Sequence, residues 1–380
     1  MRPEIELLLQ CASSLFAPEP EYGWKGFPGG AVDWPCFLDM VRFHRAVFPA
    51  FRFLAGAARD LAPASVVEDL RRVHLSILAS NLRAARELVE VAAVLEKAGC
   101  PVVFYKGPLL AVSAYGDLGG RQFTDLDLFL RTDDLGPAGR ELVRLGYRPP
   151  DGARRTFTGL TLSLQRDAVF LGDKGRLPLE VQWRIAQRYH PVFPKPAELW
   201  SRCRRTKFEG AELLTFSPED TLLVLCLHGL YHAWGILQMV TDVAAVVRNL
   251  RPDWTQTLDL ARENRAERIL FLGLLLARRM LGTDLPGWLL DKARSDRVAV
   301  AAAQDSVSRF FQLENWEDKA RRFFFREAGL FPGLGAQARY VLGRLTTPNE
   351  EDLAGKPLTW GRLAALPLLR MARLFRKYFL

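Results

Sequence analysis

The spacing of the apolar residues changes along the chain and predicts which segments are helices and which are strands. From residue 1 to about residue 98, apolar residues recur every three and four positions, which predicts helices joined by turns. The longest such run extends from Ser65 to Gly99 and ends in a glycine suited to a helix C-cap. Between Pro18 and Pro35 the chain is rich in Gly, Pro and aromatic residues, which predicts an ordered loop.

The next segment has the pattern of a strand followed by a helix. Residues 101–105 form a short β-branched and aromatic run, which predicts a strand. This strand leads through Lys106-Gly107 into a helix predicted over Leu109–Tyr115. A second helix is predicted over residues 133–145, and Gly146-Tyr147 marks its end.

Carboxylates alternate with leucines in a second predicted strand, residues 124–131 (TDLDLFLR). Because successive side chains of a strand point to opposite faces, Asp125 and Asp127 are expected on the same face, opposite the leucines. Two carboxylates placed in this way can bridge one or two hard cations through their oxygen atoms.

A predicted hairpin follows, and beyond it the pattern becomes helical again. Residues 160–171 and 176–185 predict two strands joined by a Gly-Asp-Lys-Gly turn. Glu180 faces away from the apolar side chains of its own strand. From Glu198 onward the apolar spacing is typical of a helix bundle.

Residues 221–241 contain no charged side chain and are about as long as a bilayer span. However, His228, His232 and Gln238 lie within this segment, and the sequence Ser-Pro-Glu-Asp before it is typical of a helix start. We therefore expect a central buried helix rather than a membrane span.

Together these elements predict an α+β protein. A small mixed-sheet domain at residues 99–200 is expected between a helical N-terminal region (1–98) and a helical C-terminal domain (201–380). The 380 residues are 49% hydrophobic, which excludes a disordered, fibrous or small disulfide-stapled protein. Five scattered cysteines without a Cys-x-x-Cys pair argue against a disulfide framework or a thiolate zinc site and suggest a cytoplasmic location.

The net charge of +9 is unevenly distributed. Residues 140–209 carry 15 Lys and Arg against seven Asp and Glu, and residues 361–380 carry five basic residues and no acid. Such concentrations suggest a polyanionic ligand, such as nucleotide phosphates or RNA, although a solvated basic face explains them equally well. The basic run at 202–207 is interpreted as a solvated linker, and residues 361–380 as a closing helix packed on its own domain rather than on a membrane.

The candidate chemistry lies with Asp125, Asp127 and Glu180, together with Lys106-Gly107 in the turn before them. A third carboxylate on a neighbouring strand would complete a two-metal site for nucleotide phosphates. Paired acids at a strand end are often merely solvated. Here they interrupt an apolar strand, where a buried charge is costly unless something positive binds to it.

The segment KGPLLAVSAYGDLGGRQFTDLDLFL, followed by LPLEVQWRI, resembles the nucleotidyltransferase superfamily typified by DNA polymerase β and kanamycin nucleotidyltransferase. More narrowly, it is similar to an uncharacterised bacterial nucleotidyltransferase family. The resemblance covers roughly residues 100–245. The residues that match the family pattern are Lys106, Gly107, Tyr115, Arg121, Asp125, Asp127, Glu180 with Trp183, and His228, His232, Trp234 and Asp242.

The resemblance implies a transfer of a nucleoside monophosphate from an NTP to an unidentified acceptor, with release of pyrophosphate. It implies that Asp125, Asp127 and Glu180 bind Mg²⁺, or Mn²⁺ in its place, and that Glu180 helps to deprotonate the acceptor. The acceptor is a small molecule, an RNA or a protein, and an inactive nucleotide- or RNA-binding module is the alternative function. The implied nucleotide-binding residues are Lys106, Gly107 and Arg121, and the implied acceptor pocket comprises His228, His232 and Asp242.

Three departures from the superfamily pattern bear on activity. Pro108 stands where a phosphate-contacting Ser or Gly is usual, and the spacing between Gly107 and Asp125 is longer than the superfamily norm. Gln182 replaces a histidine that often follows the third acid. None of these departures removes a carboxylate, so an active enzyme remains the prediction.

Overall fold

The computed structural model describes residues 2–16, 32–149, 157, 159–173, 175–191, 194–310, 327–348 and 360–379. Within these residues a mixed sheet has the strand order β3-β4-β5-β2-β1-β7-β6. Strand β2 pairs antiparallel with β1 and parallel with β5, so these three strands form its centre. The strands are β1 (Val102–Phe104), β2 (Leu126–Leu130), β3 (Tyr147–Arg148), β4 (Asp167–Gly172), β5 (Leu179–Gln182), β6 (Arg204–Phe208) and β7 (Ala211–Thr215).

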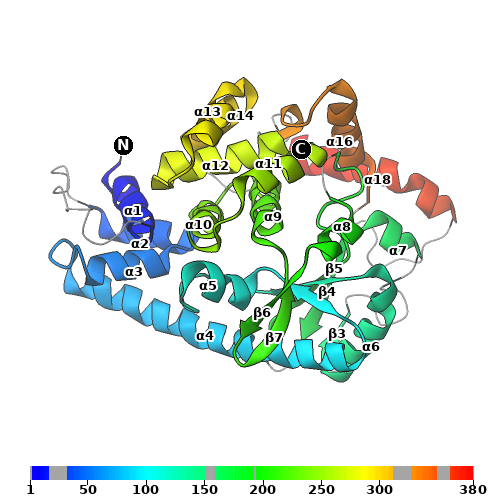
Figure 1. Ribbon diagram of the computed structural model, residues 1–380, viewed down its shortest axis with the longest axis horizontal. Coiled ribbons are helices and arrows are strands. Elements are labelled where there is room, and N and C mark those ends of the chain that lie inside the picture. The colour runs from blue at the N-terminus through cyan, green and yellow to red at the C-terminus, as the bar shows by residue number, and fades with distance from the viewer. Residues whose placement is uncertain are drawn as a thin grey trace.

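Helices cover both faces of the sheet. In Figure 1 the long helix α4 runs below the sheet and the helices α9–α12 lie above it. The N-terminal helices are α1 (Pro3–Ser14), α2 (Trp34–Phe43), α3 (Val47–Ala55) and α4 (Ala64–Lys97). Between the strands lie α5 (Gly107–Tyr115), α6 (Leu135–Arg144), α7 (Gly159–Leu164) and α8 (Pro196–Ser201), and after them α9 (Pro218–Tyr231), α10 (Leu237–Ala245), α11 (Trp254–Glu263), α12 (Glu267–Leu281), α13 (Gly287–Ser295), α14 (Arg297–Phe310), α16 (Leu334–Thr346) and α18 (Trp360–Phe379).

The alternation of β2 divides the core into two clusters. Leu126, Leu128 and Leu130 pack with α4 and α6 below the sheet. Phe129 packs with Val103 and the helices on the opposite face. Because side chains alternate along a strand, Asp127 lies on the same face as Phe129, toward the upper helices.

Several predicted elements are confirmed. Helices α1 and α4 form as expected, and Gly99 after α4 is left-handed (φ 73°). Strand β1 leads into α5 as predicted. The C-terminal segment is the helix α18, and Arg370 Nε donates to the carbonyl of Arg344 at 3.1 Å. The predicted loop at 18–35 lies outside the described residues except for its last four.

The prediction that the chain is helical from Glu198 onward is wrong, because β6 and β7 form a hairpin that extends the sheet. Both turn residues, Glu209 and Gly210, have positive φ, as a tight hairpin requires. Strand β7 pairs in parallel with β1, so the sheet continues to Thr215, past the predicted boundary at residue 200. The basic run is therefore an edge strand with its flank rather than a linker, and Arg202 and Arg205 pair with Asp220 and Glu212.

The first predicted strand of the other hairpin is also partly wrong. Residues 160–164 belong to the helix α7, and β4 begins only at Asp167. The pairing from Asp167↔Gln182 to Phe170↔Leu179 already uses all of β5. No residue of β5 is left to pair with an earlier segment, so α7 turns away and its Leu162 carbonyl accepts from Arg184 Nη1 at 2.8 Å.

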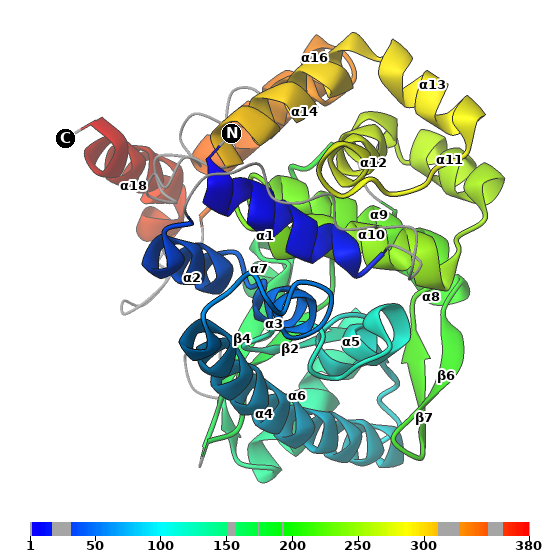
Figure 2. The ribbon, with the colours of Figure 1, turned by 90° about the vertical axis from the view of Figure 1, so that its left-hand side faces the viewer.

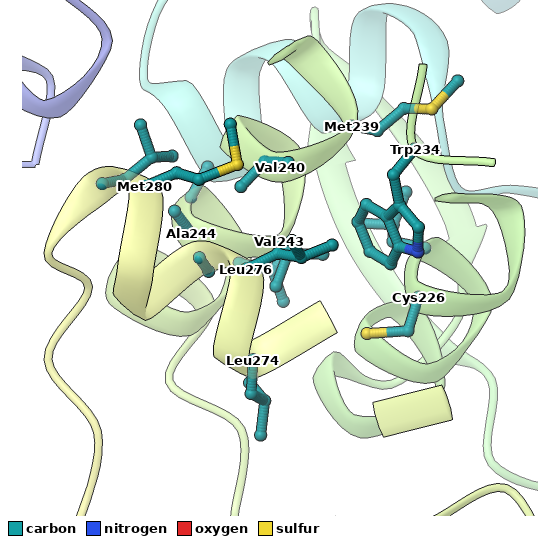
Figure 3. Close-up of a cluster of buried hydrophobic side chains, with 14 of the residues drawn as sticks. Cys226, Trp234, Met239, Val240, Val243, Ala244, Leu274, Leu276 and Met280 are labelled. Carbon is teal, nitrogen blue, oxygen red and sulfur yellow. The ribbon is translucent and has the colours of Figure 1, made fainter. Parts of the chain in front are cut away.

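The predicted helix at 221–241 is two helices, α9 and α10. Ala233 and Trp234 between them both have positive φ. Trp234 is buried, and a Cβ on Gly229 would lie 2.6 Å from its ring. Figure 3 shows Trp234 beside Cys226 in the apolar core above the sheet. Of the described helices, none is long and apolar enough to cross a membrane.

Candidate functional site

The three predicted carboxylates lie on the upper face of the sheet. Asp127 on β2 is the register partner of Glu180 on β5 in the parallel pair, so the two residues are adjacent. Asp125 precedes β2 by one residue and therefore has the same parity as Asp127. The structure thus brings together the acids that the sequence placed on two separate strands.

Two of these acids form ion pairs, one with a buried lysine and one with a partly buried arginine. Lys106 Nζ lies 3.0 Å from Asp127 Oδ1, and both side chains are less than 9% exposed. Arg166 Nη2 lies 3.1 Å from Glu180 Oε1 and 2.9 Å from Asp167 Oδ2. Arg166 was not identified from the sequence.

Asp125 differs from Asp127 and Glu180 in its pairing. Its carboxylate makes no hydrogen bond or ion pair with any other described residue. Burial and the charge of Asp127 raise the pKa of Asp125 to about 6, although the positive charges of Lys106 and Arg121 act in the opposite direction. The site therefore carries carboxylate charge that its own cations do not neutralise.

This excess charge on oxygen ligands fits a hard divalent cation such as Mg²⁺. The carboxylates do not form a complete coordination site in this structure, since no three Asp, Glu, His or Cys side chains among the described residues are grouped to hold an ion. Lys106 and Arg166 instead occupy positions beside Asp127 and Glu180.

Gln182, which departs from the superfamily pattern, positions Asp127. Its Nε2 donates to Asp127 Oδ1 at 3.0 Å, and its Oε1 accepts from the hydroxyl of Tyr105 at 2.6 Å. Tyr105 and Gln182 are both buried. The chain from Tyr105 through Gln182 to Asp127 therefore fixes the orientation of one carboxylate.

Gly107 lets the start of α5 approach the acids. It has a positive φ of 57°, and a Cβ at this position would lie 3.5 Å from Leu126 Cδ2 and 3.9 Å from the carbonyl oxygen of Asp125. Pro108 occupies the first turn of α5, where a backbone N–H has no partner within the helix. The proline is thus compatible with the helix although it removes one N–H from the site.

Arg121 and Asp242 form a separate buried cluster with Tyr115. Arg121 donates to Asp242 through Nε (2.9 Å) and Nη2 (3.0 Å), and the Tyr115 hydroxyl donates to Asp242 Oδ1 at 2.6 Å. Burial alone would lower the pKa of Arg121, but the charge of Asp242 raises it above its ordinary value. This cluster ties the loop before Asp125 to α10, and both hydrogen bonds of the Arg121 guanidinium go to Asp242.

His228 and His232 line a cavity together with Lys106. Their rings are 4.5 Å apart and line a small cavity of about 20 Å³, together with Lys106 and Arg166. Burial, followed by the charge of Lys106, lowers the pKa of both imidazoles, that of His232 to about 4. Both rings are therefore neutral at pH 7. Asp242 does not line this cavity, so the structure separates it from the histidines with which it was grouped.

Sequence reasoning missed Tyr105 and Arg166 as residues of this region. Tyr105 ends the predicted strand directly before Lys106, so its place in the chain was a usable signal. Arg166 can be recognised as a residue of the site only when β4 is paired with β5 in the correct register.

Comparison with known proteins assigns the chain to a family. Residues 30–282 match the model of a family described as uncharacterised nucleotidyltransferase, which is more than half of the chain. The matched range contains the strands β1, β2 and β5 with their carboxylates. No curated protein and no solved structure matches the chain significantly. On the strength of the family match, the chain belongs to the uncharacterised nucleotidyltransferase family.

Proposed function

We propose that the protein transfers a nucleoside monophosphate from an NTP to an acceptor, with Mg²⁺ as cofactor and pyrophosphate as the second product. The observation that carries the proposal is the set of three carboxylates on one sheet face. Asp127 and Glu180 are register partners, and Asp125 beside them has no partner among the described residues. Membership of a nucleotidyltransferase family supports the same chemistry.

The metal would be held by Asp125 and Asp127, with Glu180 completing the site. A bound divalent ion supplies orientation of the phosphates and neutralises the charge that develops on them. Within the chain itself, Gln182 and Tyr105 keep Asp127 in place. Glu180 is the carboxylate available to accept the proton of an acceptor hydroxyl.

Lys106 and Gly107 form the proposed phosphate-binding part of the site. Lys106 is the N-cap residue of α5 and Gly107 is its first residue, so the N-terminal backbone N–H groups of this helix are the proposed phosphate donors. The neutral imidazoles of His228 and His232 line the adjoining cavity. There each ring can donate one hydrogen bond and accept another from the molecule that receives the nucleoside monophosphate. The acceptor is a small molecule, an RNA or a protein with a free hydroxyl or phosphate.

A second candidate function is nucleotide binding without catalysis. The ion pairs Lys106–Asp127 and Arg166–Glu180 favour it, because they neutralise two of the three acids without any metal. Such a module would bind NTPs or RNA but would transfer nothing. The two functions differ in their need for a divalent cation.

The test of the proposed function uses NTPs labelled at the α-phosphate. The protein is incubated with each NTP, Mg²⁺, and separate RNA, protein and small-molecule fractions of a cell extract. We expect pyrophosphate release and Mg²⁺-dependent transfer of label into one fraction. Asp125→Asn should abolish transfer, whereas Asp133→Asn, which changes an exposed acid of the same charge, should not. NTP binding without transfer into any fraction would favour the non-catalytic module.

A further inference from the structure

A cavity of about 530 Å³ is lined mainly by residues of α11, α12 and α13 and of the turn between α11 and α12. Figure 2 shows α9 and α10 between these three helices and α5, the helix that begins beside Asp125. The cavity shares no residue with the one that adjoins the carboxylates. Its volume is within the range typical of small-molecule sites. It is therefore a separate place where the protein can hold a ligand.

Four cations and two acids line this cavity, namely Arg262, Arg265, Arg268 and Lys292 with Glu267 and Asp296. Both acids are paired. Arg262 Nε lies 3.3 Å from Glu267 Oε1, and Arg268 Nε lies 3.0 Å from Asp296 Oδ2. Asp296 Oδ1 also accepts from the backbone N–H groups of Val298 and Ala299 at the start of α14, at 3.0 and 2.9 Å. The two acids thus neutralise two of the four cations.

Arg265 and Lys292 are the other two cations of the cavity. Among the residues that the structure describes, neither side chain has a hydrogen-bonding or ion-pair partner. The backbone of Arg265 is nevertheless fixed, because its N–H donates to the carbonyl of Arg262 at 2.9 Å and the next N–H donates to that of Ala261 at 2.7 Å. Lys292 belongs to α13 and is partly buried. The cavity therefore carries two positive charges in excess.

The remaining wall of the cavity is largely apolar. Phe271 and Leu330 are buried, and Pro332 lies beside them in the lining. Arg268 holds this wall in place, since its Nη1 donates to the carbonyl of Gly329 at 3.3 Å while its Nε binds Asp296. One guanidinium thus joins α12, the start of α14 and the segment that contains Leu330. The charged and the apolar walls are therefore held together by the fold.

We propose that this cavity binds a small molecule that carries a phosphate group on an apolar body about the size of an aromatic ring. The two excess charges of Arg265 and Lys292 match the charge of nearly −2 that a phosphate monoester carries at neutral pH. Charge-assisted hydrogen bonds from both side chains would hold the phosphate. The apolar body would pack on Phe271 and Leu330. The inference goes beyond the proposed function, because the site is separate from the carboxylates.

The test measures the binding of phenyl phosphate by calorimetry at pH 7.5, with a chelator present to remove divalent cations. We expect one saturable site with a Kd below about 1 mM, and inorganic phosphate should bind about 10-fold more weakly because it lacks the ring. Lys292→Gln and Arg265→Gln should each weaken phenyl phosphate binding by about 10-fold or more, the range for a lost charge-assisted hydrogen bond. Neither substitution breaks an ion pair with a described residue, so both variants should melt as the wild type does.

Two matched controls remove the same charge elsewhere. Arg294→Gln changes a residue of α13 that lines a different cavity, and Arg251→Gln changes an exposed arginine whose backbone is left-handed like that of Arg265. Both controls should bind phenyl phosphate with wild-type affinity. The inference is overturned if the wild type does not bind phenyl phosphate, if inorganic phosphate binds equally well, or if Lys292→Gln and Arg265→Gln keep the wild-type affinity. None of these results affects the proposed function, whose NTP binding requires Mg²⁺ and Asp125.

Discussion

Asp125 carries a charge that the fold does not neutralise. Its pKa of about 6 lies above the ordinary value of 3.8 because of burial and the neighbouring carboxylate of Asp127. A group of this kind lowers the stability of the metal-free protein at neutral pH. Residues that bind a ligand commonly lower the stability of the ligand-free protein in this way.

We therefore predict that Asp125→Asn stabilises the metal-free protein at pH 7.5. A carboxyl group with a raised folded-state pKa contributes stability that is fully present below about pH 3.8 and is lost as the pH rises through about 6. Asparagine does not ionise, so the variant avoids this loss. The gain in the free energy of unfolding at pH 7.5 should be on the order of 1–3 kcal/mol, measured by urea unfolding with a chelator present.

At pH 4 the variant and the wild type should unfold at nearly the same urea concentration, because most of the Asp125 side chain is then protonated in the folded protein. Asp133→Asn, at an exposed position, should be neutral at both pH values. A variant that is no more stable than the wild type at pH 7.5 would contradict the electrostatic description of the site.

At the scale of elements, the loop between α5 and β2 is held from two sides. Asn81 of α4 donates to the carbonyls of Leu118 (2.7 Å) and Arg121 (2.8 Å). On the other side, the Arg121 side chain is bound by Asp242 of α10. The position of Asp125 at the end of this loop thus depends on one helix that precedes the sheet in the sequence, α4, and one that follows it, α10.

Removal of one partner of this buried pair should be strongly destabilising. We predict that Asp242→Asn lowers the free energy of unfolding by about 3–5 kcal/mol, because it leaves Arg121 buried without its counter-charge. The double variant Arg121→Met/Asp242→Leu should cost clearly less, since no charge remains. Equal urea midpoints for Asp242→Asn and the wild type would show that the pair does not hold the loop.

Local patterns in the sequence were sufficient to predict the central strands of the sheet but not its edge strands. The alternation in β2 and the glycine after β1 are encoded within a few residues, so the carboxylate face could be predicted. Strand β7 pairs with β1, which lies about a hundred residues earlier, and a basic run obscured the alternation of β6. The break before α10 depends on the packing of Trp234 against Gly229, which no local pattern encodes. Arg166 reaches the site only through the pairing of β4 with β5.

At the scale of the whole molecule, the three regions predicted from the sequence contribute side chains to the same hydrophobic cores. Val66 and Leu70 of α4 pack with the upper helices, whereas Leu88 and Leu95 of the same helix pack below the sheet. The upper core contains residues of α1, the sheet and α12 together. The helical regions are thus part of the same folded body as the sheet.

A fragment of residues 99–200 should therefore not fold by itself. It lacks α4, which covers the lower face of the sheet, and β7, which pairs with β1. We predict non-cooperative urea unfolding of this fragment by circular dichroism, in contrast to a cooperative transition of the full chain. A sharp, native-like transition of the fragment would show that the sheet is an independent domain.

The most direct test of the account is thermal melting of the full chain with each of the four NTPs, with and without Mg²⁺. A ligand that binds only the folded state raises its stability, so at saturation the melting temperature should rise by about 2 °C or more with at least one NTP, and only with Mg²⁺. Asp125→Asn, which breaks no ion pair with a described residue, should lose this rise while Asp133→Asn keeps it. No rise with any NTP, or an equal rise in Asp125→Asn, would contradict the assignment of the carboxylates as a metal-dependent nucleotide site.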